Sequence, residues 1–277
     1  MIVNENPLSP SALERVLARD RRLIAVALAA LALVAWSYLL VLSRQMSDDA
    51  SMASVVSSMP HMPNMPGIGG ATGGSAHSIA LTALMWWTMM IGMMVPSAAP
   101  MILLYGNVQR RQLAAESPTL RVALFAAGYV AIWGAFSVLA AGAQIALTRL
   151  ELLAPVDLTV KEWLGALLVA LAGIYQLTPL KNACLRGCRS PAEFLSSHWR
   201  RGNAGAFRMG VDHGVYCLGC CWLLMGLLFV VGVMNLVWVA VIAAFVLLEK
   251  LAPYGETTAK INGVALLAFA LFLALNA

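Results

Sequence analysis

The sequence has few charged residues: Asp, Glu, Lys and Arg make up 11% of its 277 residues, whereas hydrophobic residues make up 61%. This balance excludes an ordinary water-soluble domain, in which roughly a quarter of the residues are charged. Cysteine is also scarce, with 5 residues that all lie between positions 184 and 221, which excludes a secreted disulfide scaffold. The 18 Lys and Arg residues form no single basic face, so we expect no nucleic acid partner.

The alternation of apolar and polar residues that is typical of a membrane β-barrel is missing as well. Segment 23–42 is instead apolar at every angle around a helix. The sequence therefore predicts an all-α fold, a polytopic transmembrane helical bundle, in which about twenty apolar residues cross the bilayer. The seven expected spans lie at 23–42, 79–105, 122–148, 162–180, the two arms of a hairpin within 211–249 that turns at 232–235, and 261–277.

The basic residues predict how this bundle is oriented. With a cytoplasmic N-terminus, 15 of the 18 Lys and Arg residues lie on the cytoplasmic side, as the positive-inside rule requires. We therefore expect a multi-pass protein of the bacterial inner membrane. A re-entrant sixth helix is the alternative, and it would move the C-terminus to the cytoplasmic side. We expect the first span to be an anchor rather than a signal peptide, since no Ala-x-Ala cleavage site closes it.

The predicted outer loop is rich in possible ligands for a soft metal. The chain divides into a cytoplasmic arm (1–22), a transmembrane anchor (23–42), this loop (43–78) and a six-helix membrane domain (79–277). Thioether and imidazole groups suit copper ions and resist an oxidising compartment. The loop therefore predicts a copper collector or, as the alternative, a flexible linker that happens to contain Met and Pro. Its candidate ligands are Met59, His61, Met62 and Met65.

The helix after this loop continues the pattern of methionines. At about 100° per residue, Met85, Met89 and Met93 form one stripe, with Met90 and Met94 beside it and Met101 two turns further on. A row of thioethers can pass a soft cation along a helix. Packing is the alternative, because Met also fills gaps between helices.

The cysteines and one histidine form the most specific pattern in the chain. Four side chains share one helix face at spacings i, i+4, i+7 and i+8: His213, Cys217, Cys220 and Cys221. Cys184 and Cys188 join them if the basic loop 181–212 folds back against the bundle. Two to four of these groups would bind copper, with Cu(I) preferred, or zinc as the second choice. Ordinary packing of small buried cysteines is the alternative.

The remaining polar and aromatic residues suggest membrane contacts rather than chemistry. We expect Asp212 and Glu249 to reach the membrane interface, and His198 to contact lipid headgroups. Trp86 and Trp87 are expected to form part of the interfacial aromatic belt.

Several motifs together resemble one known family. They are MWWTMMIGMMVP at 85–96, YQLTPLKNACLRGC at 175–188 and HGVYCLGCCW at 213–222. The chain resembles, over about residues 80–255, a bacterial family of predicted metal-binding integral membrane proteins that are often labelled copper-chaperone-like. The resemblance implies a metal-binding role, with copper as the metal, and it implies no catalytic residue.

These observations lead to three functional hypotheses. The first is a copper-handling membrane protein, not an enzyme, that moves or delivers the ion to a membrane metalloenzyme under assembly. In it, the loop collects copper, the methionine helix passes it and the cysteine cluster accepts it. The second is an accessory subunit of a larger membrane complex. The third is a membrane thiol oxidoreductase that uses Cys217 and Cys220, or Cys184 and Cys188.

Overall fold

The computed structural model describes most of the membrane domain and the first helix. The described residues are 24–45, 76–111, 118–154, 158–233, 235–252 and 254–276. The predicted cytoplasmic arm and almost the whole predicted outer loop lie outside them. Four of the predicted copper ligands therefore receive no structural description: Met59, His61, Met62 and Met65.

The described residues form helices, which confirms the all-α prediction. In chain order they are the helix Ile24–Gln45, α2 (Ala76–Arg111), α3 (Pro118–Arg149), α4 (Glu162–Gln176), α5 (Pro179–Arg189), α6 (Pro191–His198), α7 (Gly202–Gly226), α8 (Leu228–Val231), α9 (Leu236–Leu251) and α10 (Gly255–Asn276). Within these ranges, β-structure is limited to one isolated bridge between Leu153 and Val160.

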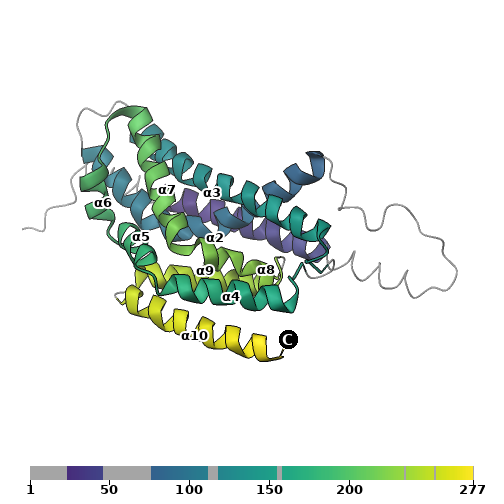
Figure 1. The fold of residues 1–277 in the computed structure, drawn as a ribbon. Helices are drawn as coiled ribbons and strands as arrows, with labels where there is room; N and C mark the ends of the chain where they lie inside the picture. The colour runs from purple at the N-terminus through teal and green to yellow at the C-terminus, as the bar shows by residue number, and fades with distance from the viewer. Residues whose placement is uncertain are drawn as a thin grey trace, which may run out of the picture.

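The helices pack in two groups (Figure 1). Helix α3 packs against both α2 and α7, and α10 packs along α4. Helix α9 contacts both groups, since it packs against α2 and α7 on one side and α10 on the other. Helices α5 and α6 lie at one end of the bundle, where α5 packs against α7. The interior of the α2, α3 and α7 group holds the core of the protein.

Glycines bring α3 and α7 into backbone contact. A Cβ atom at Gly210 would overlap the carbonyl oxygen of Phe125, and one at Gly128 would overlap that of Phe207. Gly214, one turn after Gly210, would place a Cβ 2.9 Å from Ile132. Small residues four positions apart are the usual means by which membrane helices approach closely. This contact holds the cysteine face of α7 tightly against α3.

The predicted helix 162–180 is interrupted, and the predicted loop 181–212 is helical. Helix α4 ends at Gln176, and α5 starts at Pro179 with a change of direction of 66°. Pro179 cannot donate its backbone nitrogen to a continuing helix. Thr178 also caps the new helix, because its side chain accepts a hydrogen bond from the Lys181 backbone N–H at 3.3 Å. A Thr-Pro pair therefore converts one predicted helix into two.

A break between helices occurs at the predicted position, since α8 ends at Val231 and α9 starts at Leu236. Gly232 has a φ of 94°, which favours glycine. The Asn235 side chain accepts a hydrogen bond from the Trp238 backbone N–H at 3.5 Å and so caps α9. Helix α7, however, starts nine residues before the predicted 211 and is followed by the short helix α8.

Within the part of the chain that the structure describes, five helices are long and apolar enough to cross a membrane, or six if the bent pair α4 and α5 counts as one span. Helix α9 has 16 residues, fewer than the about twenty of a complete crossing. The structure is therefore compatible with a membrane protein. The seven spans and the cytoplasmic N-terminus stay predictions.

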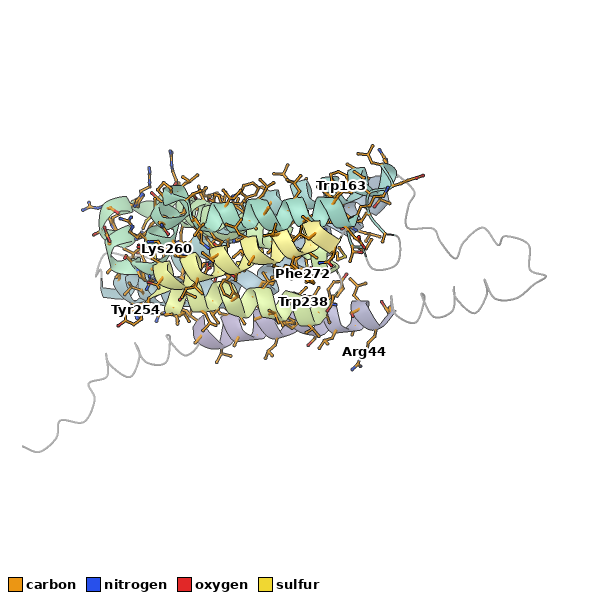
Figure 2. All side chains as sticks on the ribbon, turned by 60° about the horizontal axis from the view of Figure 1, so that its bottom comes forward. Arg44, Trp163, Trp238, Tyr254, Lys260 and Phe272 are labelled. Atoms are coloured by element: carbon orange, nitrogen blue, oxygen red, sulfur yellow. The ribbon has the colours of Figure 1, made fainter. Side chains whose placement is uncertain are left out.

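The surface of the bundle carries large apolar side chains (Figure 2). Trp163, Trp238 and Phe272 are among the exposed residues, at 56%, 45% and 60% of their surface. The prediction that Trp86 belongs to an interfacial belt is wrong. Its side chain is fully buried, and its Nε1 donates a hydrogen bond of 2.6 Å to Gln144. An indole can be buried in the bundle because a facing helix supplies a polar partner.

Candidate metal centre

The site is centred on Cys217, in the interior of the bundle. Its sulfur accepts a hydrogen bond of 2.9 Å from the Lys250 ammonium group of α9. The hydroxyl of Tyr129 on α3 lies 3.1 Å from the same sulfur. All three side chains are buried. Three helices that are distant in sequence therefore converge on one thiol.

The other two cysteines of α7 lie beside Cys217, as the helical spacing predicts. Cys220 and Cys221 each donate from sulfur to the Cys217 carbonyl oxygen, at 3.1 Å in both cases. The Cys221 sulfur also lies 4.0 Å from the thioether sulfur of Met94 on α2. A thiol and a thioether in contact are both soft groups, the type that Cu(I) prefers.

Helix α5 brings a fourth cysteine to this cluster. Cys188 lies within hydrogen-bonding reach of Cys217 and Cys220. Cys184, one turn earlier, packs on α7 at Gly219. If Gly219 had a Cβ atom, that atom would lie only 2.7 Å from the Cys184 sulfur. The segment after α4 therefore folds back onto α7, and the reason is the bend at Thr178 and Pro179. The four residues Cys188, Cys217, Cys220 and Cys221 are referred to below as the thiol cluster.

Lys250 is a residue of the site that the sequence patterns do not reveal. Besides Cys217, its ammonium group donates a 3.0 Å hydrogen bond to Ser97 Oγ on α2. A buried ammonium requires a negative or strongly polar partner. The only sequence signal was a Glu-Lys pair at the end of an apolar helix, and such a pair normally indicates a helix end that reaches the membrane interface.

The expectation that Glu249 reaches the membrane interface is wrong, since its side chain is 1% exposed. Glu249 Oε2 lies 2.6 Å from the Lys181 ammonium of α5, and both side chains are buried. Its other oxygen accepts a hydrogen bond of 2.9 Å from Gln176 on α4. The carboxylate is buried because it finds a cation and an amide at the break between α4 and α5. This ion pair ties α5, and with it Cys188, to α9.

His213 lies one turn before Cys217 on α7 and is 3% exposed. Its ring stacks on Phe125 and Tyr129, with centroid distances of 6.1 and 5.7 Å, and it meets Phe194 edge to face at 5.3 Å. Its Nδ1 atom has no hydrogen-bond partner among the described residues. A buried imidazole nitrogen without a partner is costly, so it is a candidate for a ligand.

The methionines of α2 all point into the bundle. The Met94 thioether contacts the sulfur of Cys221, and the Met94 carbonyl oxygen accepts a hydrogen bond from the Tyr129 hydroxyl at 3.0 Å. The six predicted ligands of this helix are buried in the core: Met85, Met89, Met90, Met93, Met94 and Met101. Burial agrees with both the transfer hypothesis and the packing hypothesis.

Pro96 changes the hydrogen bonding of the α2 backbone. A proline leaves the carbonyl four residues earlier without its helical donor. That carbonyl belongs to Gly92, and it accepts a hydrogen bond of 3.2 Å from Trp36 Nε1 on the helix Ile24–Gln45. The first helix is thereby held against α2 at the depth of the methionines.

The thiol cluster is compact, but its side chains are not arranged as a metal site. Within the ranges that the structure describes, no three His, Cys, Asp or Glu side chains are positioned to hold a metal ion. The reason is visible in the hydrogen bonds: Cys220 and Cys221 point to the Cys217 carbonyl, and Lys250 and Tyr129 surround the Cys217 sulfur. Rotation of the thiols away from the carbonyl would be needed to direct them at an ion.

Comparison with known proteins gives one family. The family described as PpoB2, copper chaperone, matches residues 83–273, which is well over half of the chain. The match includes α5, α7 and α9, which carry the thiol cluster and Lys250. Comparisons with curated proteins and with solved structures give no match.

Proposed function

Because this chain belongs to the PpoB2 family of copper chaperones, we propose that it is a membrane-embedded Cu(I) carrier that holds the ion at the thiol cluster. The observation that supports this best is the position of Cys217, which interacts both with Cys188 on α5 and with the buried ammonium of Lys250 on α9. Copper is the cargo of this site. The protein would sit in the bacterial inner membrane and pass the ion to a membrane metalloenzyme under assembly.

The charges of the site fit a monovalent soft cation. Cu(I) held by two thiolates has a net charge of −1, which is unfavourable in a buried site. The ammonium of Lys250 lies 2.9 Å from Cys217 and would make the loaded site neutral. A divalent ion with two thiolates is already neutral, so Lys250 would leave one positive charge in excess. The net charge of the loaded site therefore favours Cu(I) over Zn(II).

Each neighbour of the cluster has a separate role in the proposal. Cys188 and Cys217 supply thiolates from two different helices, and Met94 supplies a neutral thioether beside Cys221. Tyr129 holds the Cys217 sulfur and the Met94 backbone in place through its hydroxyl group. Binding would release protons from the thiols that become ligands.

Metal analysis of the purified protein tests the proposal. The protein is purified in detergent under reducing, anaerobic conditions after growth with copper, and its bound metals are measured by mass spectrometry. We expect copper in near-stoichiometric amount and little zinc. A metal-free protein that also resists loading with Cu(I) would refute the carrier and favour an accessory subunit.

Replacement of Lys250 by Met is expected to weaken Cu(I) binding by about 10- to 100-fold, the usual cost of removing a group that supports metal ligands. The reason is the uncompensated charge of the loaded site. Competition with a Cu(I) chelator measures the affinity. Lys260→Met is the matched control, because Lys260 is an exposed lysine on α10 (Figure 2). Equal affinity of the two variants would show that Lys250 has no part in binding.

Thiol–disulfide exchange is a second candidate function, and the closeness of Cys188 to Cys217 and Cys220 favours it. In that reaction two of these thiols would be oxidised to a disulfide, and a disulfide substrate would take up the two electrons and two protons. Alkylation of free thiols in intact cells, followed by mass spectrometry, separates the two functions. A carrier keeps these cysteines reduced, whereas an oxidoreductase accumulates a disulfide between them.

A further inference from the structure

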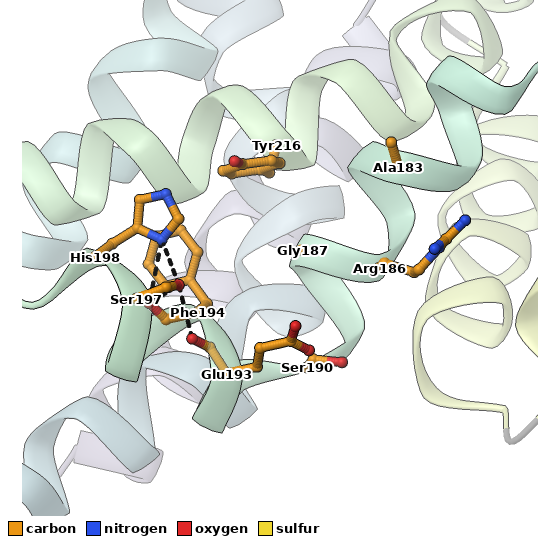
Figure 3. A pocket seen from close by; sticks show the side chains of 9 residues that line it. All are labelled: Ala183, Arg186, Gly187, Ser190, Glu193, Phe194, Ser197, His198 and Tyr216. Carbon is orange, nitrogen blue, oxygen red and sulfur yellow. Dashed lines mark hydrogen bonds between the residues drawn. The ribbon is translucent and has the colours of Figure 1, made fainter.

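A pocket opens at the end of the bundle where α5, α6 and α7 meet (Figure 3). Its volume is about 350 Å³. One wall is formed by α5, a second by α6, and the Tyr216 ring of α7 lies across from them. The lining residues are Ala183, Arg186, Gly187, Ser190, Glu193, Phe194, Ser197, His198 and Tyr216. Because it adjoins the helices that carry the thiol cluster, the pocket is a candidate route to it.

The imidazole of His198 lines this pocket. Its ring stacks on Phe194 with a centroid distance of 4.6 Å and an interplanar angle of 9°. Nδ1 lies 2.9 Å from Ser197 Oγ and 3.3 Å from the Phe194 carbonyl oxygen. These contacts occupy Nδ1 and orient the ring, which is the usual arrangement of a metal-binding histidine. Nε2 therefore remains for a ligand.

The pocket also attracts a cation. Glu193 has no ion-pair partner within the described ranges, whereas Arg186 at the opposite wall pairs with Glu256 at 3.3 Å. The carboxylate of Glu193 is thus the uncompensated charge of the lining. A positive ion would gain electrostatic free energy at this position.

Phe194 contacts both histidines. Its side chain is 3% exposed, and its ring stacks on His198 at a centroid distance of 4.6 Å and meets His213 edge to face at 5.3 Å. His213 is buried, lies one turn before Cys217 and has no partner for Nδ1 among the described residues. The Phe194 ring therefore links the imidazole at the pocket to the imidazole beside the thiol cluster.

We propose that this pocket is the port through which Cu(I) enters and leaves the thiol cluster. His198 is the outer ligand, His213 is the inner ligand, and Phe194 closes the passage between them. The proposal rests on the carrier function proposed above and adds the route of exchange. Helix α6 has eight residues and carries both Phe194 and His198, so a shift of this one short helix opens the passage.

The rate of copper release tests the port separately from binding. Protein loaded with Cu(I) is mixed in detergent with excess Cu(I) chelator, and release is followed by stopped-flow absorbance. His198→Ala is expected to slow release about 10-fold, at least the usual effect of removing a group that merely supports a ligand, because the ion loses its outer ligand, while the copper stoichiometry is unchanged. Phe194→Ala is expected to speed it. Ser196→Ala is the control, because Ser196 is an exposed residue of α6 outside the pocket.

A variant at the pocket wall tests the port without changing a buried residue. Ala183 is an exposed residue of the pocket wall, and Ala183→Trp is expected to fill the pocket and slow release while the folding of the protein is unchanged. Parent-like release rates in Ala183→Trp and His198→Ala, with normal copper content, would overturn the port and leave the carrier intact. A parent protein that binds no copper would instead overturn the carrier function itself.

Discussion

Joint replacement of Cys217, Cys220 and Cys221 by serine is expected to lower the affinity for Cu(I) by more than about 100-fold, since loss of a mere supporting group already costs about 10- to 100-fold. Serine is close to cysteine in size, but its hydroxyl is a hard ligand that Cu(I) does not prefer. The variant should therefore fold and lose its copper. Copper content by mass spectrometry and affinity by chelator competition measure both quantities.

Cys184→Ser provides the matched control for this experiment. Cys184 is half-buried and packs on Gly219, one turn from the thiol cluster. A much smaller loss of affinity is expected for this variant than for the triple variant. Unchanged copper stoichiometry and affinity in the triple variant would exclude the thiol cluster as the copper site, whatever the control shows.

Replacement of Lys181 by Met is expected to lower the free energy of unfolding by about 3–5 kcal/mol, the cost of removing one partner of a buried ion pair. The reason is that Glu249, which lies 2.6 Å from Lys181, is left buried with only Gln176 as a partner. For a protein of this size, 1 kcal/mol corresponds to roughly 2–4 °C in Tm. Thermal unfolding in detergent, followed by circular dichroism, should show a correspondingly large decrease.

The double variant Lys181→Met, Glu249→Met should recover most of this loss, because no charge is then left buried without a partner. Glu256→Gln is the control on the same face of the bundle. The Arg186–Glu256 pair is exposed, at 72% and 42% of the two side chains, and such pairs contribute less than about 1 kcal/mol. If the Lys181→Met variant is as stable as the parent, the ion pair does not hold α5 in place.

The same variants report on the copper site. Lys181 lies on α5, two turns before Cys188, so its ion pair with Glu249 sets where α5 lies against α7. Loosening α5 should make Cys188 react faster with a thiol reagent, while Cys217 on α7 changes less.

Much of the fold follows from local patterns. The long apolar segments predict helices, and the helical spacing of His213, Cys217, Cys220 and Cys221 places them on one buried face. The return of Cys184 and Cys188 toward this face also depends on a local signal, the Thr178-Pro179 pair. This pair marks the start of a new helix, whereas the composition of 181–212 alone predicts a loop where α5 and α6 lie.

The polar partners of the site could not be predicted in this way. Lys250, Glu249 and Lys181 are adjacent to apolar helix ends, where charged residues usually reach the interface. Their burial depends on which helices pack side by side, and that is decided by contacts between residues 33 to 153 positions apart. No pattern within one helix contains this information.

The sequence by itself determined the class of the fold, the soft ligand types and the face of α7 on which the thiols lie. These properties depend on residue type and on the 3.6-residue period of a single helix. Only the tertiary structure decided that Lys250 and Tyr129 meet Cys217, that Lys181 pairs with Glu249 and that Phe194 contacts both His198 and His213. The physical reason is that a buried polar group is stable only with a partner, and here other helices supply the partners.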